Sequence, residues 1–257
     1  MSEVIGLVPA AGRATRIAPL PCSKELYPIG FRPVDGGRSV RAKAACHHLL
    51  EKMRFAGIAK AYIVLGKNKW DIPNYFGNGL MLDMNLAYLT LSASSGAPYT
   101  LDEAYPFVRH SVIAFGFPDI VFEPDDAFVR LLARQRQSEA CVTLGLFPAE
   151  QPQKVDMVDV APDGRIKRIF TKPDTTELSH SWCIGVWTPV FTEFLHAYIA
   201  AHKQTAAAIS EVSIGEVVQA AIEAGLRVEA ISVSETSYLD IGTAEDLVRA
   251  VQRYAFC

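Results

Sequence analysis

This sequence of 257 residues lacks the features that identify a membrane protein, a secreted protein or a disulfide-rich protein directly. No apolar stretch reaches the roughly 20 residues that a membrane-spanning helix needs. The short apolar N-terminus contains Glu3 and no basic segment, unlike a signal peptide. The five cysteines form no C-x-x-C pair, and their odd number does not indicate a disulfide framework. We therefore expect a cytoplasmic protein with reduced thiols and no membrane partner.

An excess of positive charge is also absent. The 25 lysine and arginine residues are outnumbered by 28 aspartate and glutamate residues, which gives a net charge of −3. Proteins that bind nucleic acids usually carry a broad basic surface, so no such partner is expected. The adjacent His47 and His48 lack the H-E-x-x-H spacing of a zinc site, and we expect one to face the core and one the solvent. Any phosphate binding must then be local.

The sequence does contain strand-like and helix-like apolar segments that follow one another in regular alternation. Hydrophobic residues make up 50% of the chain and charged residues 21%, which suits a large core and argues against disorder. Strand-like segments cover residues 61–65, 86–91, 112–115, 140–147, 182–187 and 228–233, and helix-like segments cover 42–57, 127–136, 191–202, 213–224 and 247–254. This predicts an α/β fold with a Rossmann-like, mostly parallel sheet flanked by helices.

Two local signals refine this fold. Ser39 is expected to cap the first helix, which ends near Gly57. The Asp163-Gly164 pair is typical of a turn between two strands, residues 155–160 and 166–170. We expect this small antiparallel addition to close one side of a pocket.

The opening stretch predicts a site for phosphate groups. The apolar run from Val4 to Val8 breaks into small residues and Gly12, as a buried strand does when it ends in a tight turn. Backbone N–H groups in such a turn can bind an anion, and Arg13, Arg16 and Lys24 add positive charge nearby. In a parallel sheet this turn lies at the carboxyl edge, where ligands bind.

The strand of residues 112–115 leads to Asp119, which places a carboxylate at the same edge. A simple helix cap is the alternative, but Asp125 or Asp126 suits the following helix better. A dinucleotide-binding dehydrogenase does not fit, because the turn is not G-x-G-x-x-G and the strand of residues 61–65 ends without an acidic residue.

The opening stretch resembles the signature of the sugar-1-phosphate nucleotidyltransferases. In this signature, A-A-G-x-G-T-R is followed by an apolar residue, then by x-P, and then by a segment that contains a lysine and ends in L-x-P. The matching residues are Ala10, Ala11, Gly12, Thr15, Arg16, Ile17, Pro19, Lys24, Leu26 and Pro28. Tyr238-Leu239-Asp240-Ile241-Gly242-Thr243 matches the family's later (W/Y)-x-D-x-G-T step. The resemblance follows nearly the whole chain and is thinnest from Trp70 to Ser111.

The resemblance implies a Mg²⁺-dependent enzyme that joins a nucleoside triphosphate to a sugar 1-phosphate and releases pyrophosphate. It implies Asp119 and Asp240 as the metal ligands, Arg16 and Lys24 as the catalytic charges, and Lys172, Gly185 and Glu211 as acceptor-binding residues. The nucleotide-binding residues would be Ala10, Ala11, Gly12, Arg13, Thr15, Arg16, Lys24 and Gly96. One domain over residues 1–257 would hold the nucleotide in residues 1–147 and the acceptor in residues 148–257. Homo-oligomers occur in the family.

Four departures leave the substrates open. Ala14 replaces the second glycine of the turn, Phe117-Pro118 separates Gly116 from Asp119, Thr171 replaces the glutamate of the family's E-K-P step, and no glutamine lies near Gly96 to bind the base. Glu211 could equally stabilise a helix N-terminus. Glucose 1-phosphate with dTTP or UTP is favoured. A cytidylyltransferase for an unusual or non-sugar phosphate, and a non-catalytic nucleotide-binding regulatory protein, are the alternatives.

Overall fold

The computed structural model describes residues 3–92, 95–205 and 211–255, and its centre is a nine-stranded sheet. The strand order is β10-β9-β11-β6-β1-β4-β5, with β8 beside β11 and β12 beside β8. The strands are β1 (Val4–Ala10), β4 (Lys60–Leu65), β5 (Asn85–Thr90), β6 (Val112–Gly116), β8 (Val142–Pro148), β9 (Met157–Val160), β10 (Ile166–Phe170), β11 (His180–Trp187) and β12 (Val228–Ser232).

The core of this sheet is parallel. Strand β1 pairs in parallel with β4 and β6, and β5 pairs in parallel with β4. The direction reverses at β11, which is antiparallel to both β6 and β8. The predicted hairpin is present as β9 and β10 and extends the sheet beyond β11. The predicted α/β fold class, with its small antiparallel addition, is confirmed.

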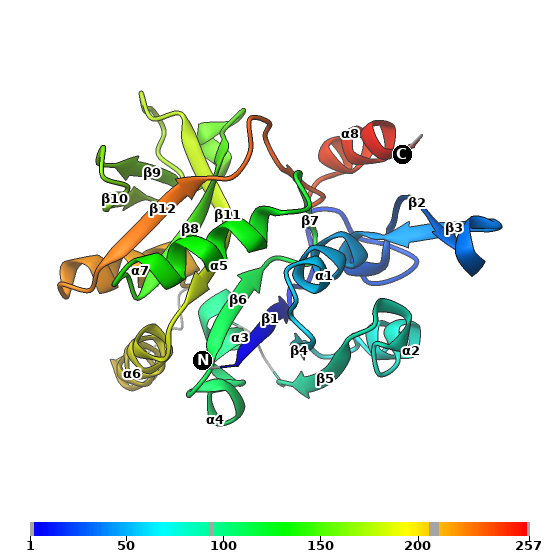
Figure 1. Ribbon diagram of the computed structural model, residues 1–257, viewed down its shortest axis with the longest axis horizontal. Helices are drawn as coiled ribbons and strands as arrows, with labels where there is room; N and C mark the ends of the chain where they lie inside the picture. Colours follow the sequence, from blue (N-terminus) through cyan, green and yellow to red (C-terminus); the bar gives the residue numbers. More distant parts are fainter. Residues whose placement is uncertain (1–2, 93–94, 206–210, 256–257) are drawn as a thin grey trace.

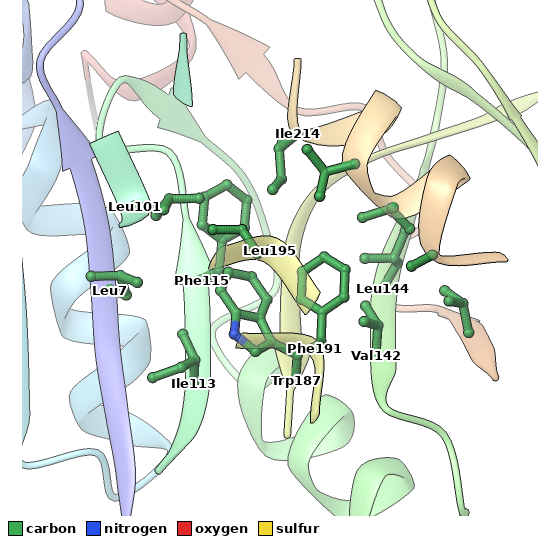
Figure 2. Packing of buried hydrophobic residues seen from close by; sticks show 14 of the residues in the cluster. Leu7, Leu101, Ile113, Phe115, Val142, Leu144, Trp187, Phe191, Leu195 and Ile214 are labelled. Carbon is green, nitrogen blue, oxygen red and sulfur yellow. The ribbon is translucent and has the colours of Figure 1, made fainter. Parts of the chain in front are cut away.

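Helices cover both faces of the sheet, as the alternation of side chains along β1 requires. Leu7 belongs to one buried cluster and Val8 to the other. The cluster with Val8 contains residues of α1 (Ala45–Phe55), α2 (Asp71–Phe76) and α5 (Ala127–Gln137). The cluster with Leu7 contains residues of α3 (Ala97–Asp102), α4 (Tyr105–Val108), α6 (Pro189–Thr205) and α7 (Ile214–Glu223). Figure 2 shows how side chains of β1, β6, β8 and β11 meet those of α3, α6 and α7 in one core.

The segment before α1 differs from the prediction. Ser39 does not cap a helix. It begins strand β3 (Ser39–Ala44), which pairs with β2 (Pro28–Val34), and α1 begins only at Ala45. The turn between the strands contains Gly36 and Gly37, both with positive φ, and this turn signal outweighs the helical spacing of the alanines that follow. The hairpin lies beside α8 (Ala244–Tyr254) in Figure 1.

The two histidines of α1 also differ from the prediction, because both are buried. His47 is 0% exposed and His48 is 4% exposed. His47 packs against the rings of Tyr75 and Phe76, and His48 packs against Tyr254. Burial lowers the pKa of His47 to about 3 and that of His48 to about 4. Both are therefore neutral core residues.

The remaining elements are short. They are β7 (Ile120–Val121), β13 (Leu239–Asp240) and the 3₁₀ turns η1 (Lys24–Leu26), η2 (Asp35–Gly37), η3 (Leu80–Leu82) and η4 (Pro152–Lys154). Within residues 3–92, 95–205 and 211–255, the structure contains no helix with both the length and the apolar character to cross a membrane.

Candidate active site

Two short strands hold Asp119 and Asp240 side by side. Strand β7 follows Asp119, strand β13 ends in Asp240, and the two strands pair in antiparallel fashion with Asp240 opposite Ile120. The Ile241 N–H donates to the backbone oxygen of Asp119 at 3.1 Å. Two carboxylates from distant parts of the sequence therefore meet at the carboxyl edge of the parallel strands. Asp119 is not a helix cap, because Asp126 occupies that position before α5.

Lys24 lies against this pair of carboxylates. Its Nζ forms an ion pair with Asp119 Oδ2. Burial, the largest single influence, lowers the pKa of Lys24, but Asp119, Glu25 and Asp240 together raise it above its usual value. The neighbouring Glu25 is 1% exposed and accepts from Lys69 Nζ at 2.6 Å, which anchors η1 to the loop before α2. The position of Lys24 is thus fixed on both sides.

Asp240 has the electrostatic features of a cation ligand. Burial, and next the charge of Asp119, raise the pKa of its carboxyl group to about 6. Within the described part of the chain its Oδ1 is buried and has no hydrogen-bond partner. Arg16 Nη2 lies 2.8 Å from the place where a Cβ of Gly242 would stand, which brings the guanidinium close to the Asp240 segment. A bound cation would satisfy the orphaned oxygen, and the residues present fit one.

The number of ligands narrows the choice of cation. The residues that the structure describes include no group of three or more His, Cys, Asp or Glu side chains able to hold a metal. Two carboxylates are too few for a structural zinc or calcium site. They suit Mg²⁺, which usually takes one or two carboxylates and fills its other positions with substrate phosphates and water.

The loop from Ala10 to Lys24 leaves space for a ligand at Gly12. A Cβ on Gly12 would meet no described protein atom within 4 Å, and its φ is not in the positive region. The fold itself does not require glycine there, and the backbone at this position is open to a ligand. Arg13, Thr15 and Arg16 are all exposed along the loop.

Ala14 occupies the left-handed region, with a φ of 53°. Of the two explanations open from the sequence, strain or narrowed space, the structure supports strain. Its carbonyl oxygen accepts from the N–H groups of Ile17 and Ala18 at 3.1 and 3.0 Å, which closes the turn. An alanine in this conformation costs about 1 kcal/mol or more relative to glycine.

Replacing Ala14 by glycine should therefore raise the free energy of unfolding by roughly 0.5–1 kcal/mol, because the relief of strain exceeds the added entropy of the unfolded chain. Urea denaturation of both proteins measures the difference. Ala133→Gly is the matched control, since Ala133 is exposed in helix α5, where glycine should cost about 1 kcal/mol. Equal losses of stability in both variants would contradict the role assigned to the turn.

The predicted acceptor residues lie in different surroundings. Lys172 follows β10 with a φ of 41° and lies near Asp156, and its charge opposes the rise in the pKa of that carboxyl group. Gly185 lies inside β11, where a Cβ would stand 3.0 Å from Leu144 Cδ2, so packing of the sheet explains this glycine. Glu211 is exposed and does not cap α7, because Ser213 and Glu216 form the capping box.

Gly96, predicted from the sequence to contact the nucleotide, lies at the start of α3 with a φ of 119°. A Cβ there would stand 2.2 Å from the backbone oxygen of Val212, so the close approach of these two segments requires glycine. The Val212 N–H donates to the Ser95 oxygen at 3.3 Å. The segment before α7 is therefore fixed to the loop before α3.

An open pocket adjoins Asp240. Including the solvent at its mouth, it has a volume of about 570 Å³, and its walls include Arg16, Lys154, Tyr238, Asp240 and Arg249. The sequence analysis missed Lys154, Arg249 and the neighbouring Asp156. Lys154 directly precedes the predicted strand of residues 155–160 and Asp156 lies at its start. Because the hairpin was expected to close one side of a pocket, this position was the available signal.

The raised pKa of Asp240 predicts a pH dependence for the metal-free protein. A carboxyl group with a pKa of about 6 in the folded state and roughly 4 when unfolded keeps its proton longer in the folded state. Its contribution to stability is complete below pH ~4 and is lost as the pH rises through about 6. In EDTA, the Tm of the wild type should therefore fall over this range more steeply than that of Asp240→Asn. Parallel Tm curves would contradict the shifted pKa.

Comparison with protein families matches residues 5–255 to the family described as nucleotidyl transferase. The chain belongs to this family. The sequence resemblance is thereby confirmed at the level of the family.

The chain is also similar to two curated proteins. It is 22% identical over 250 residues to the low-salt glycan biosynthesis nucleotidyltransferase Agl11 of Haloferax volcanii, which covers 96% of this chain and 65% of the relative. It is 24% identical over 249 residues to a glucose-1-phosphate thymidylyltransferase of Streptomyces griseus, with 94% and 63% covered. The chain thus spans less than two thirds of either relative.

Solved structures share the fold of this nucleotidyl transferase. A Bacillus anthracis protein assigned as a glucose-1-phosphate thymidylyltransferase, in complex with a sucrose, has a TM-score of 0.83 at 18% identity, with 99% and 96% of the two chains covered. A UDP-glucose pyrophosphorylase complexed with UDP-glucose has a TM-score of 0.77 at 19% identity and 99% coverage of both chains. The inositol-1-phosphate CTP transferase of T. maritima has a TM-score of 0.75 at 16% identity, with 100% and 98% covered.

Proposed function

We propose that the chain transfers a nucleotidyl group from a nucleoside triphosphate to a sugar 1-phosphate. An oxygen of the acceptor phosphate forms a bond to the α-phosphorus, the bond from this phosphorus to the β-phosphate oxygen breaks, and pyrophosphate leaves. The acceptor oxygen is already anionic at neutral pH, so no general base is needed. Such transfers depend on positioning and on neutralisation of charge.

The juxtaposition of Asp119 and Asp240 at β7 and β13, with Lys24 against them, carries this proposal. The two carboxylates would hold Mg²⁺, which when bound neutralises charge on the triphosphate. Lys24 and Arg16 bind the phosphate groups of the nucleotide and of the departing pyrophosphate. Gly12 lets the backbone approach these phosphates, and Lys172 binds the phosphate of the acceptor.

We propose glucose 1-phosphate with dTTP or UTP as the favoured substrates. The names of the Streptomyces griseus relative and of two structural neighbours support this choice. Residues 1–147 would bind the nucleotide, with Arg13, Thr15 and Gly96 near it, and residues 148–257 would bind the acceptor, with Gly185 and Glu211 near it.

A second candidate is a cytidylyltransferase for an unusual or non-sugar phosphate. Thr171 in place of the glutamate before Lys172, and the lack of a glutamine near Gly96, favour a changed acceptor and base. The name of one structural neighbour, an inositol-1-phosphate CTP transferase, is consistent with it.

Pyrophosphate release tests both candidates. The wild type is assayed with Mg²⁺ against dTTP, UTP, CTP, GTP and ATP, each combined with several sugar 1-phosphates, inositol 1-phosphate and phosphocholine. Asp119→Asn provides the blank. We expect one nucleotide and one class of acceptor to stand out, and activity only with CTP would select the second candidate. Nucleotide binding without turnover in any combination would overturn the proposal and favour a regulatory protein.

A further inference from the structure

A carboxylate that the sequence analysis did not select lies beside Lys172. Asp156 directly precedes β9 and follows Lys154 and Val155, which line the open pocket together with Asp240. Its carboxylate lies close enough to Lys172 for the lysine charge to act on its pKa. The start of the hairpin thus lies beside the loop that carries the proposed acceptor-binding lysine, whose φ is 41°.

Charged groups surround Asp156 on several sides. The Lys172 side chain approaches from the loop after β10, Glu216 from α7 and Tyr238 from the segment before β13. Burial raises the pKa of Asp156 to about 6, even though Lys172 opposes this shift. The carboxylate is therefore ionised at pH 7.5 but poorly solvated. Such a group gains more than an exposed carboxylate does when a ligand donates a hydrogen bond to it.

Helix α7 is shaped to accommodate this carboxylate. Gly215 lies in its first turn, and a Cβ there would stand 2.1 Å from Asp156 Oδ2. The φ of Gly215 is not in the positive region, so the backbone does not require glycine. The close approach of Asp156 is the local reason for this residue. The helix, the hairpin and the Lys172 loop thus converge on one carboxylate.

We propose that Asp156 is a specificity-determining residue that accepts a hydrogen bond from a hydroxyl group of a polyhydroxylated acceptor phosphate. This inference rests on the proposed function. A carboxylate accepts O–H donors and repels phosphate, whereas Lys172 attracts phosphate and repels cations. The adjacent pair would therefore orient an acceptor with its phosphate towards Lys172 and a hydroxyl group towards Asp156.

Asp156→Asn tests the proposal in the full chain. With the best nucleotide at saturation, the KM for glucose 1-phosphate at pH 7.5 should rise about 10- to 100-fold, while the KM for the nucleotide stays unchanged. Asp159→Asn is the matched control, because Asp159 lies on β9, after Asp156, Met157 and Val158, and pairs with Lys167 at 3.5 Å, and it should leave both constants unchanged. An unchanged KM in Asp156→Asn would overturn the inference.

Deoxy analogues separate direct recognition from a structural effect. In the wild type, removal of the hydroxyl that Asp156 binds should raise the acceptor KM about 10-fold or more, and in Asp156→Asn the same analogue should cost little. The 2-, 3-, 4- and 6-deoxy forms of glucose 1-phosphate are compared in turn. Equal penalties in both proteins for every analogue would overturn the inference.

Gly215→Ala gives an independent test that leaves Asp156 in place, in case the asparagine variant does not fold. The added methyl group would displace the carboxylate, so the acceptor KM should rise about as much as in Asp156→Asn. A normal acceptor KM in Gly215→Ala would contradict the proposal.

If the wild type shows no turnover with any pair of substrates, the proposed function itself fails. If it turns over only phosphocholine, the function stands in its second form and the role of Asp156 is wrong.

Discussion

Replacement of Asp240 by asparagine should lower kcat about a thousandfold at saturating Mg²⁺ and leave the fold intact. If the metal contributes about 4 kcal/mol to the stability of the transition state, losing one of its two carboxylates forfeits most of that contribution. The fold should not suffer, because the asparagine removes the repulsion between two adjacent carboxylates in a poorly solvated site. In EDTA at pH 7.5 the Tm of the variant should equal or exceed that of the wild type.

Initial rates of pyrophosphate release and thermal unfolding measure the two effects. Asp126→Asn is the matched control, since Asp126 also has a buried oxygen without a hydrogen-bond partner among the described residues but lies at the start of α5, outside the site. It should retain kcat. A second readout is the rise in Tm on addition of Mg²⁺, which should be present in the wild type and much smaller in Asp240→Asn. Near-normal kcat in Asp240→Asn would remove this residue from the metal site.

Replacement of Lys24 by alanine should reduce kcat about 100- to 1000-fold, the usual loss when one fixed charge that stabilises a transition state is removed. Unlike the previous variant, this one should also lose stability. Lys24 is the ion-pair partner of Asp119, and without it two adjacent carboxylates lie in a buried site with no lysine beside them. The Tm in EDTA should fall, and added Mg²⁺ should restore much of it, because the cation replaces the missing charge.

Lys43→Ala is the control for Lys24→Ala, because Lys43 forms an ion pair of similar length with Glu51, 2.6 Å, and its side chain is 19% exposed. It should keep kcat and its response to Mg²⁺. If Lys24→Ala lowers the Tm but retains kcat, Lys24 is only a structural partner of Asp119. If Mg²⁺ fails to raise the Tm of Lys24→Ala, the two carboxylates do not bind the cation as proposed.

The sequence predicted the parallel core because each of its strands is a short apolar run that alternates with a helical segment. It also selected Asp119, which follows an apolar strand, and Asp240, which matches the later step of the family signature. Their direct pairing through β7 and β13 was not predictable from those signals. Two-residue strands have no periodicity, and their pairing depends on the return of the chain from a distant segment.

The predictions that were wrong also concern residues whose surroundings come from distant parts of the chain. The residues before α1 include alanines that favour a helix, and the Gly36-Gly37 turn that joins β2 to β3 decides otherwise. His47 and His48 are adjacent on α1, where one solvent-facing ring is the simple expectation. In the structure α2 covers His47 and α8 covers His48. Asp156 was missed because its partners, Lys172 and Gly215, come from two other elements.

The ladder between β7 and β13 has a consequence for the synthesis of the protein. The loop from Ala10 to Lys24 and Asp119 both leave the ribosome well before Asp240, and the core strands β1, β4 and β6 can pair in the meantime. Contacts between distant segments form late, since they close the longest loops. A nascent chain can therefore expose the loop proposed to bind phosphate, and one carboxylate, without the second. The proposed nucleotide turnover would begin only when β13 has paired, so that incomplete chains would consume no triphosphate.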